Sequence, residues 1–311
     1  MNILITGGLG HIGSYFLNNL SRNYNYSHEL IRLKVVDNLL THRYATLFDL
    51  DRDITFLDKD MDNLTEEDIK GTDVVIHLAA ITNAEKSFEN KDDIEEVNIR
   101  KTEKFINLCK GCKVPRFIFP SSTSVYGVAS DVVYEDDDNF INPQSPYAES
   151  KIKIENMIKN ELGKDTKYLI LRFGTIFGTS VGMRFHTAIN KFCYEVVMKR
   201  PLTIWKQNYE QYRPYLGLND ALRSVEHFII KDDDCWNNTY NVLSLNSKLK
   251  DIISCIEEAT GKVELNMVNT PLLNQFSYKV NDDKVRNTGF VPKDKLIDSV
   301  KDTLSIFRGI K

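Results

Sequence analysis

Apolar runs and helical patterns alternate along the first half of the chain. Short apolar runs bounded by glycine, proline or polar residues are typical of buried strands, whereas apolar positions that recur with each helical turn are typical of helices. Strands are therefore predicted at 2–6, 33–37, 55–57, 73–80 and 116–119, the last closed by Pro120. An amphipathic helix is predicted after the first strand and another at 95–109. This alternation indicates an α/β fold with parallel strands, right-handed crossovers and a doubly wound sheet.

The pattern becomes less regular towards the C-terminus. Short strands are predicted at 202–204 and 239–242, and helices at 183–192, 219–230 and 247–259. The sequence shows no internal repeat and no low-complexity linker. A mixture of this kind suits a smaller α/β lobe that follows the parallel sheet.

The first strand runs directly into Gly7-Gly8-Leu9-Gly10-His11-Ile12-Gly13. Strand, glycine turn and helix is the context that a dinucleotide-binding motif requires, and Rossmann-type sheets carry it after their first strand. Gly7 permits the tight turn, Gly10 lets the backbone approach a pyrophosphate, and Gly13 lets the helix pack closely against the strand. The helix N-terminus, with His11 and Ile12, supplies amide donors and a positive dipole end to the phosphates. We therefore predict a Rossmann-type, dinucleotide-binding domain.

An acidic residue, Asp37, ends the second predicted strand. A carboxylate there accepts hydrogen bonds from the adenosine ribose hydroxyls and repels a 2′-phosphate, which favours NAD over NADP. Arg43 lies a few residues further on and keeps NADP as an alternative. Further cofactor contacts are predicted at or near the ends of the second, third and fourth strands, by Asn38, Asp60, Met61, Leu78, Ala79 and Ala80.

Tyr147 and Lys151 are four residues apart in a predicted helix, so they face the same way. An ammonium near a phenol lowers the pKa of the tyrosine, and a phenolate near neutral pH is a usable general base. The hydroxyl-rich stretch 121–127 leaves the fifth strand at the edge where parallel sheets bind ligands. Beside the Tyr-Lys helix, its hydroxyl groups are placed to polarise a substrate oxygen.

Composition and charge narrow the function classes. The 42% hydrophobic and 27% charged content is that of a soluble globular protein, and the net charge of −4 provides no basic footprint for nucleic acid. No apolar run approaches a membrane span, and no signal-peptide pattern precedes the first strand, so we expect a cytoplasmic protein. Cys109 and Cys112 form a lone C-x-x-C, interpreted as reduced cysteines and not a metal site. His77, inside an apolar strand, is interpreted as a packed core histidine.

These motifs together resemble the extended short-chain dehydrogenase/reductases, specifically the NAD-dependent epimerase/dehydratase group that acts on nucleotide sugars. The resemblance covers essentially the whole chain. It rests on the glycine turn, Asp37, 77–80, 121–127, Tyr147 with Lys151, 171–178, 213–220 and 289–292. It implies an NAD-binding domain at 1–175 and a mainly substrate-binding lobe at 176–311, with room for a few later segments to return to the first domain.

The resemblance also implies roles for individual residues. Tyr147 matches the active-site base, Lys151 its partner that also binds the nicotinamide ribose, and Ser122 the hydroxyl group that holds the reacting oxygen. Arg213 matches a diphosphate clamp. Thr175 stands where many relatives carry a substrate-binding asparagine, and Asn190 either takes over that contact or is a solvated helix residue. The implied substrate contacts are Thr123, Ser124, Thr175, Asn190 and Arg213.

One departure from the family pattern bears on the reaction. Relatives that dehydrate the sugar carry an Asp-Glu pair directly after the catalytic hydroxyl residue, but Thr123 and Ser124 stand here and cannot act as acid and base near neutral pH. This favours a 4-epimerase that works through a transient 4-keto sugar. The first alternative is a C4 dehydrogenase or 4-ketosugar reductase with net turnover of NAD(H). A 4,6-dehydratase, a decarboxylase and a non-catalytic NAD-binding protein are further alternatives.

The family resemblance implies a homodimer, formed through the helices 95–109 and 147–162. The second face of the latter helix is not strongly apolar, because it carries Ala148, Ile152, Glu155 and Lys159. Sequence support for the dimer is therefore modest. The expected partners are a nucleotide sugar and a second copy of the chain, with no nucleic acid, membrane or metal.

Overall fold

A computed structural model of the chain describes all residues except 21–30, 85, 128–131, 232, 270–276 and 311. Its centre is a seven-stranded sheet in the order β11-β7-β5-β4-β1-β2-β3, in which all neighbours pair in parallel. The strands are β1 (Asn2–Thr6), β2 (Arg32–Asp37), β3 (Ile54–Asp58), β4 (Val74–His77), β5 (Arg116–Ser122), β7 (Lys167–Phe173) and β11 (Asn238–Val242). The order reverses between β1 and β4, which confirms the predicted Rossmann-type, doubly wound α/β sheet.

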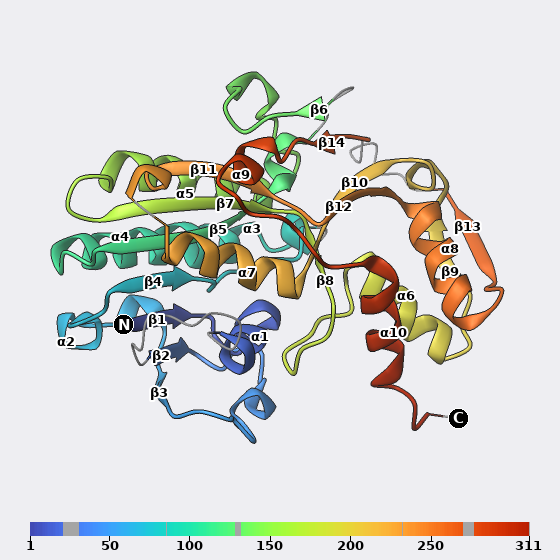
Figure 1. The fold of residues 1–311 in the computed structure, drawn as a ribbon, viewed down its shortest axis with the longest axis horizontal. Helices are drawn as coiled ribbons and strands as arrows, with labels where there is room; N and C mark the ends of the chain where they lie inside the picture. Colours follow the sequence, from blue (N-terminus) through green and yellow to red (C-terminus); the bar gives the residue numbers. More distant parts are fainter. Residues whose placement is uncertain (21–30, 85, 128–131, 232, 270–276, 311) are drawn as a thin grey trace.

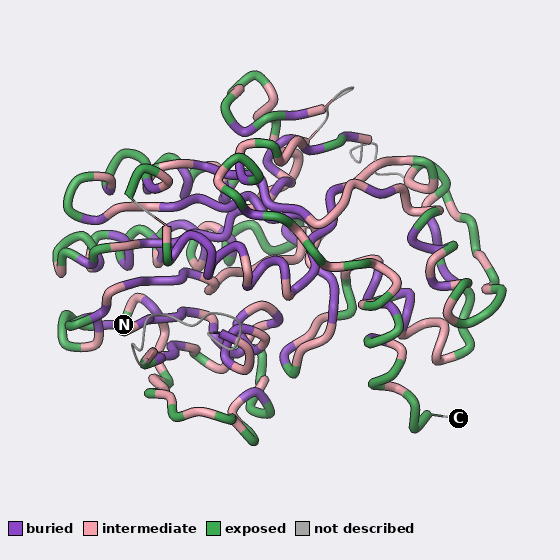
Figure 2. The backbone as a smooth tube through the Cα atoms, viewed as in Figure 1, coloured by how far each residue is buried: buried purple, intermediate pink, exposed green. Residues whose placement is uncertain are grey.

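Helices cover both faces of this sheet (Figure 1). One apolar core joins the sheet to α1 (His11–Asn19) and α7 (Leu218–Ile229). A second core joins the other face to α4 (Thr102–Gly111) and α5 (Pro146–Glu161). The central strands are buried along most of their length, while the outer sides of the helices are exposed (Figure 2). The first half of the chain also contains the helices α2 (Glu66–Ile69) and α3 (Lys91–Asp93) and the π-helix η4 (Ile94–Lys101).

A smaller lobe lies beyond the carboxyl ends of the strands (Figure 1). Its strands are β8 (Thr175–Phe177), β10 (Tyr212–Gly217) and β12 (Leu245–Lys248) in one sheet, and β9 (Leu202–Trp205) with β13 (Leu265–Val268) in another. Its helices α6 (Ala188–Val197), α8 (Leu249–Thr260) and α10 (Leu296–Ser305) pack around a third apolar core.

Short elements complete the described chain. The strands β6 (Val132–Val133) and β14 (Lys279–Val280) pair with each other, and α9 (Asp283–Asn287) contacts β11. Single 3₁₀ turns are η1 (Tyr44–Leu47), η2 (Met61–Asn63), η3 (Lys86–Phe88), η5 (Thr123–Tyr126), η6 (Asp138–Phe140), η7 (Lys206–Asn208) and η8 (Asp233–Cys235).

The predicted end of the fifth strand at Pro120 is wrong, because β5 continues to Ser122. Its pairing with β4 stops at Ile118, whereas its pairing with β7 continues to Ser122. Proline therefore stands where only one side of the strand still has a neighbour, and the missing N–H costs little there. As a result, Ser121 and Ser122 extend past β4 at the carboxyl edge of the sheet.

Other boundaries also differ from the sequence prediction. The fourth strand ends at His77, and the helix predicted at 183–192 begins only at Ala188. The helix predicted at 95–109 is part of a longer run in which η4 precedes α4. Two elements beyond residue 175, α7 and β11, return to the large sheet.

Candidate active site

The glycine turn after β1 is packed against the loop that follows β4. Gly7 has a φ of +65°, and a Cβ added there would lie 2.6 Å from the backbone nitrogen of Ala79. A Cβ on Gly13 would lie 2.4 Å from the carbonyl oxygen of Gly8. Leu78 N donates to Thr6 O at 3.0 Å, which joins the two loops. Both glycines are therefore required by close backbone approach, as the dinucleotide motif predicts.

The groups around the turn fit an NAD molecule. The Asp37 carboxylate is fixed at the end of β2, where it accepts from Leu9 N and Leu39 N at 3.0 Å each. Arg43 Nη1 is buried with no hydrogen-bond partner among the described residues, and it lies 3.9 Å from a Cβ added to Gly10. Burial lowers the pKa of Arg43, and Asp37 opposes this. An unpaired guanidinium beside a glycine turn suits a diphosphate.

The other predicted cofactor residues are placed in different ways. Asn38 Nδ2 donates to Asp60 Oδ2 at 3.0 Å, which joins the loops after β2 and β3. The Met61 side chain is buried in the second core. The His11 ring is buried and bonds to Gly178 O at 3.0 Å, and burial lowers its pKa to about 4. Packing against the core holds Ile12, while Leu78, Ala79 and Ala80 keep part of their surface exposed.

The structure brings Tyr147, Lys151 and Ser122 together, because β5 and α5 meet at the carboxyl edge of the sheet. The helix α5 is capped by Ser145, whose hydroxyl accepts from Ala148 N at 3.2 Å. Lys151 Nζ donates to the Pro120 carbonyl at 3.0 Å and lies 5.8 Å from the centre of the Tyr147 ring. Its position over the Phe119 ring, at 4.4 Å, adds a cation–π contact.

The pKa of Tyr147 is shifted in the opposite direction from the sequence prediction. Burial raises its pKa, and the opposing influences are a hydrogen bond with Ser122 and the charge of Arg184. The expectation that Lys151 lowers the pKa of this tyrosine is therefore wrong for the structure described. Lys151 is also desolvated: burial lowers its pKa to about 8, and Glu155 opposes that.

The turn η5 separates the predicted substrate residues that follow Ser122. Ser124 donates its hydroxyl to Ser122 Oγ at 2.9 Å and its amide at 3.2 Å, so both hydroxyls lie at the site. Thr123 points the other way: it is 3% exposed, and its hydroxyl donates to Phe173 O at 3.3 Å. Neither residue supplies a carboxylate, as the sequence indicates.

Arg213 and Thr175 belong to neighbouring strands of the smaller lobe, β10 and β8. Arg213 stacks on the Tyr278 ring at 5.2 Å, and the Tyr278 hydroxyl donates to Thr123 O at 3.1 Å. Arg213 is thereby held beside the turn that carries Ser122. Substrate contacts by Arg213 and Thr175 remain predictions.

Asn190 is fully buried, so its interpretation as a solvated helix residue is wrong. Its Oδ1 accepts from Gly178 N, and its Nδ2 donates to Gly178 O and Arg184 O, each at 3.2 Å. Its amide therefore holds the segment between β8 and α6 instead of presenting an open face to a ligand.

That segment contributes a residue that sequence reasoning missed. Arg184 is partly buried, its buried Nε has no hydrogen-bond partner among the described residues, and its charge acts on both Tyr147 and Arg43. Burial lowers its pKa to about 10. Nothing in the local pattern distinguishes Arg184 from a surface arginine, because only the tertiary fold places it at the site.

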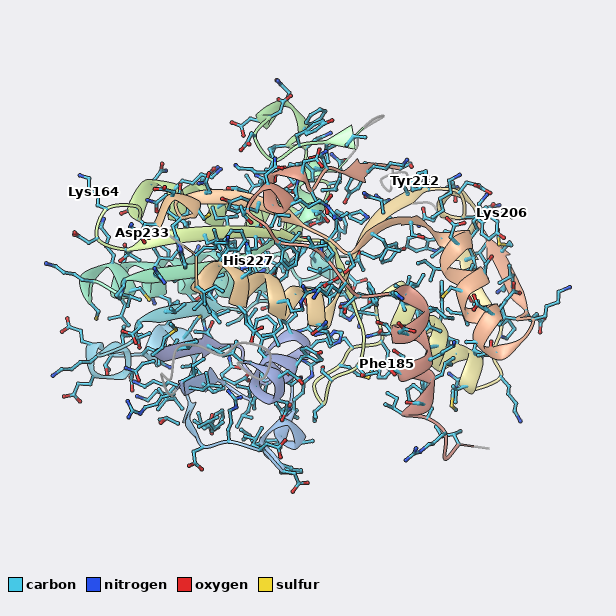
Figure 3. The ribbon with its side chains drawn as sticks, in the orientation of Figure 1. Lys164, Phe185, Lys206, Tyr212, His227 and Asp233 are labelled. Atoms are coloured by element: carbon cyan, nitrogen blue, oxygen red, sulfur yellow. The ribbon has the colours of Figure 1, made fainter. Side chains whose placement is uncertain are left out.

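Contacts on both sides fix this segment in place. Gly182 N donates to Ser14 Oγ at 2.9 Å, next to the glycine turn. On the other side, the Phe185 ring lies 5.3 Å from that of Tyr194 and 5.9 Å from that of Phe307, beside α10 (Figure 3). The segment thus bridges the glycine turn and the smaller lobe, with Arg184 between its two anchors.

His77 is a core residue, as expected. Its ring bonds to the hydroxyls of Thr6 at 2.7 Å and Thr102 at 3.1 Å. Burial lowers its pKa to about 3, so it is neutral.

All five cysteines are free, and the described residues contain no cluster of three His, Cys, Asp or Glu suited to a metal. Within the described chain, no helix has the length and apolar character needed to cross a membrane.

The fold and the site together define a class of protein: a Rossmann-type redox protein of the extended short-chain dehydrogenase/reductase kind. Residues 3–242 match the model of the NAD dependent epimerase/dehydratase family, and the chain belongs to that family. The family is NAD-dependent and similar solved structures contain NAD, so NAD is the cofactor and the NADP alternative is set aside.

Relatives of known sequence include epimerases and dehydratases. The chain is 28% identical over 283 residues to an uncharacterized UDP-glucose epimerase of Bacillus subtilis, covering 84% of this chain and 83% of that protein. It is 25% identical over 324 residues to the human dTDP-D-glucose 4,6-dehydratase, covering 98% and 89%.

A solved structure spans the full length of the chain. The UDP-glucuronic acid 4-epimerase from Bacillus cereus, in complex with UDP-glucuronic acid and NAD, is 25% identical, has a TM-score of 0.86 and covers 100% of both chains. These similarities support an enzyme, and they leave its substrate and reaction class to be argued from the site.

Proposed function

We propose that the protein is an NAD-dependent nucleotide-sugar 4-epimerase that works through a transient 4-keto sugar. The observation that carries the proposal is that Ser122 and Tyr147 are brought together at the carboxyl edge of the sheet, with Thr123 and Ser124 after Ser122 in place of carboxylates. Elimination of water needs an acid and a base beside the sugar. Oxidation and reduction at one carbon need only a proton acceptor and a hydride acceptor.

The chain's own residues would orient the sugar and move one proton. Bound NAD supplies the hydride acceptor and donor. Asp37 would hold the adenosine ribose, and Arg43 with the glycine turn the diphosphate. Tyr147 would take the proton of the C4 hydroxyl, while Ser122 holds the oxygen that becomes a carbonyl. For inversion, the 4-keto sugar would have to present its opposite face to the bound cofactor before the hydride is returned to C4, and Tyr147 would then give the proton back to the C4 oxygen.

The proposal is tested with purified protein and a panel of UDP-, GDP-, CDP- and dTDP-sugars, without added cofactor. Epimers should appear at equilibrium with no net change in absorbance at the wavelength of NADH. Stoichiometric formation or consumption of NADH would support the alternative dehydrogenase or reductase, and a 4-keto-6-deoxy product would support a dehydratase. No turnover of any sugar by protein that demonstrably binds NAD would refute the proposal.

An acidic sugar is our proposed substrate, with UDP-glucuronic acid as the first candidate. Arg184 has a buried Nε with no hydrogen-bond partner among the described residues and its charge acts on Tyr147, so it lies where a carboxylate on the sugar could pair with it. The similar Bacillus cereus enzyme is named for this substrate. A guanidinium–carboxylate pair in a desolvated site discriminates strongly against a neutral sugar.

Arg184→Met should therefore lower kcat/KM for UDP-glucuronic acid about 10- to 100-fold and change that for UDP-glucose much less. Arg200→Met is the matched control, because Arg200 is exposed and its guanidinium contacts Glu195 and the Tyr194 ring, not Tyr147. Equal losses with the acidic and the neutral sugar would contradict a carboxylate-recognition role. Steady-state kinetics on both sugars provide the measurement.

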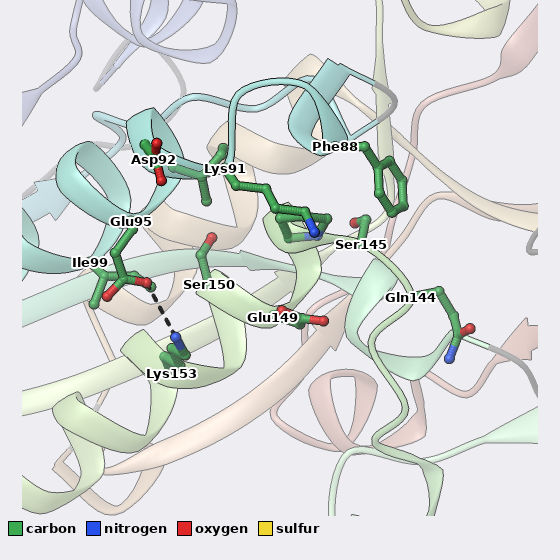
Figure 4. Close-up of a pocket in the computed structure, with 12 residues that line it drawn as sticks. Phe88, Lys91, Asp92, Glu95, Ile99, Gln144, Ser145, Glu149, Ser150 and Lys153 are labelled. Atoms are coloured by element: carbon green, nitrogen blue, oxygen red, sulfur yellow. Dashed lines mark hydrogen bonds and ion pairs between the residues drawn. The ribbon is translucent and has the colours of Figure 1, made fainter.

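We also propose the homodimer expected from the family. A pocket of about 350 Å³ lies between η4 and the side of α5 that carries Glu149 and Lys153 (Figure 4). Contrary to the sequence interpretation, Glu155 and Ala148 are buried and not available on that outer face. Sedimentation equilibrium should give twice the chain mass of 35.8 kDa. A single species at the chain mass would refute the dimer.

A further inference from the structure

A fully buried group of charges lies one helical turn beyond Lys151. Glu155 of α5 is 0% exposed and Arg172 of β7 is 1% exposed. Arg172 donates to both carboxylate oxygens, with Nη2 at 2.7 Å from Oε2 and Nε at 3.1 Å from Oε1. Ser121 Oγ donates to Oε1 at 2.5 Å. The carboxylate is thus fixed from two strands, one residue away from Ser122.

The network continues beyond this pair. Arg172 Nη1 donates to the Tyr126 hydroxyl at 3.0 Å, which in turn donates to Asn241 Oδ1 at 2.5 Å. Asn241 Nδ2 donates to Glu135 Oε2 at 2.9 Å. Glu155 raises the pKa of Arg172 despite its burial, so the guanidinium stays charged. Besides their apolar packing, the strands β5, β7 and β11 are therefore linked to α5 by a chain of buried polar bonds.

A buried ion pair is weak evidence for stability, because apolar side chains of similar volume often replace such a pair at no cost. Its location suggests another purpose. The described groups that face Lys151 are the Phe119 ring and the Pro120 carbonyl on β5, Tyr147 on α5 and neutral His77 on β4. Among the described residues, Glu155 is the carboxylate whose charge acts on Lys151.

We propose that Glu155 is a positioning residue, which Arg172 and Ser121 orient so that the buried charge beneath Lys151 is balanced and its ammonium stays protonated beside Tyr147. This inference rests on the proposed function, because it assumes that Tyr147 is the base that Lys151 serves. Without Glu155, Arg172 would become an unpaired cation in the core and would repel the proton of Lys151. Arg172 by itself would therefore disfavour the protonated form of Lys151, whereas the Glu155–Arg172 pair favours it.

The test reads Lys151 directly. In protein labelled with ¹³C-lysine, the Cε signal that disappears in Lys151→Arg is assigned to Lys151 and followed against pH. Its midpoint should lie at about 8 in the unsubstituted protein. Glu155→Gln should lower the midpoint by about one pH unit, Arg172→Gln should raise it, and the double variant should restore it towards the original value. Glu149→Gln, on the exposed side of the same helix, is the matched control and should leave the midpoint unchanged.

Activity provides a second readout. With a sugar that is turned over, Glu155→Gln should lower kcat about tenfold at pH 8 with little change in KM, and its pH profile should move to lower pH by the shift measured for Lys151. The double variant should recover both. A purely structural role for Glu155 predicts neither the shift nor its reversal by a second substitution.

The proposal is overturned if Glu155→Gln is folded by circular dichroism and the Lys151 midpoint does not move, or if the midpoints move in the opposite directions. Should Glu155→Gln fail to fold, Arg172→Gln alone decides, and a midpoint that does not rise overturns the proposal. Because the NMR titration needs no substrate, a protein without epimerase activity would still test the charge balance. Failure of the proposed function and failure of this inference are thereby distinguished.

Discussion

Tyr147→Phe is expected to reduce epimerisation by about 10³-fold while NAD binding is retained. The phenol is the group that the site offers for removal of the sugar hydroxyl proton, and its hydrogen bond with Ser122 places it at the reacting oxygen. Phenylalanine keeps the aromatic ring and removes only the hydroxyl. The loss should therefore fall on kcat, and KM should change little.

Single-turnover absorbance of the bound cofactor and steady-state product analysis together measure this effect. Tyr134→Phe is the matched control, because Tyr134 is 46% exposed and makes only a ring contact with Phe140 among the described residues. Equal activity of Tyr147→Phe and the unsubstituted protein would show that another group moves the proton, and the proposed mechanism would have to be abandoned.

Gly7→Ala is expected to remove detectable NAD binding and to lower the free energy of unfolding by about 2–4 kcal/mol. The alanine would be held at a φ of +65°, and its Cβ would lie 2.6 Å from the Ala79 nitrogen. Because the obstructing atoms belong to the backbone, the turn and the loop after β4 must move apart. The diphosphate cradle would open with them, since the amide donors of this turn and of α1 would no longer converge.

Gly71→Ala separates the steric clash from the backbone strain. Gly71 has a φ of +75°, but a Cβ there would meet no atom within 4 Å. Gly71→Ala should therefore lower the free energy of unfolding only by the backbone strain, about 1 kcal/mol, and leave NAD affinity unchanged. Urea unfolding and NADH fluorescence titration measure the two quantities. If both variants bound NADH equally well, the glycine turn would not be the cofactor site.

The first half of the fold followed from the sequence because its pattern is local. Apolar runs specify buried strands whatever their neighbours are, and the strand 2–6 was predicted with the bounds that β1 has. Strand ends were less predictable. The extension of β5 through Pro120 depends on β4 ending earlier than β7, which no local pattern states. The return of α7 and β11 to the large sheet is likewise a matter of long-range packing.

The site was predictable where spacing within one element carries the information. Tyr147 and Lys151 face the same way because they lie one turn apart in α5, and this holds in any tertiary context. The electrostatics were not predictable in this way. Burial has the largest effect on the pKa of both Tyr147 and Lys151. The pKa of Tyr147 is therefore raised, whereas the spacing of the two residues predicts that it is lowered.

What the sequence by itself determined is the family, the NAD cofactor and the list of groups that can do chemistry, because these depend on residue types at fixed spacing. Only the tertiary structure decided which groups are free to act. It turned Thr123 and Asn190 inwards to backbone partners, placed the charges of Arg43 and Arg184 near each other, and set Glu155 one helical turn from Lys151. The physical reason is that burial and pairing, which set the charge and availability of a side chain, are properties of its neighbours in space and not of its neighbours along the chain.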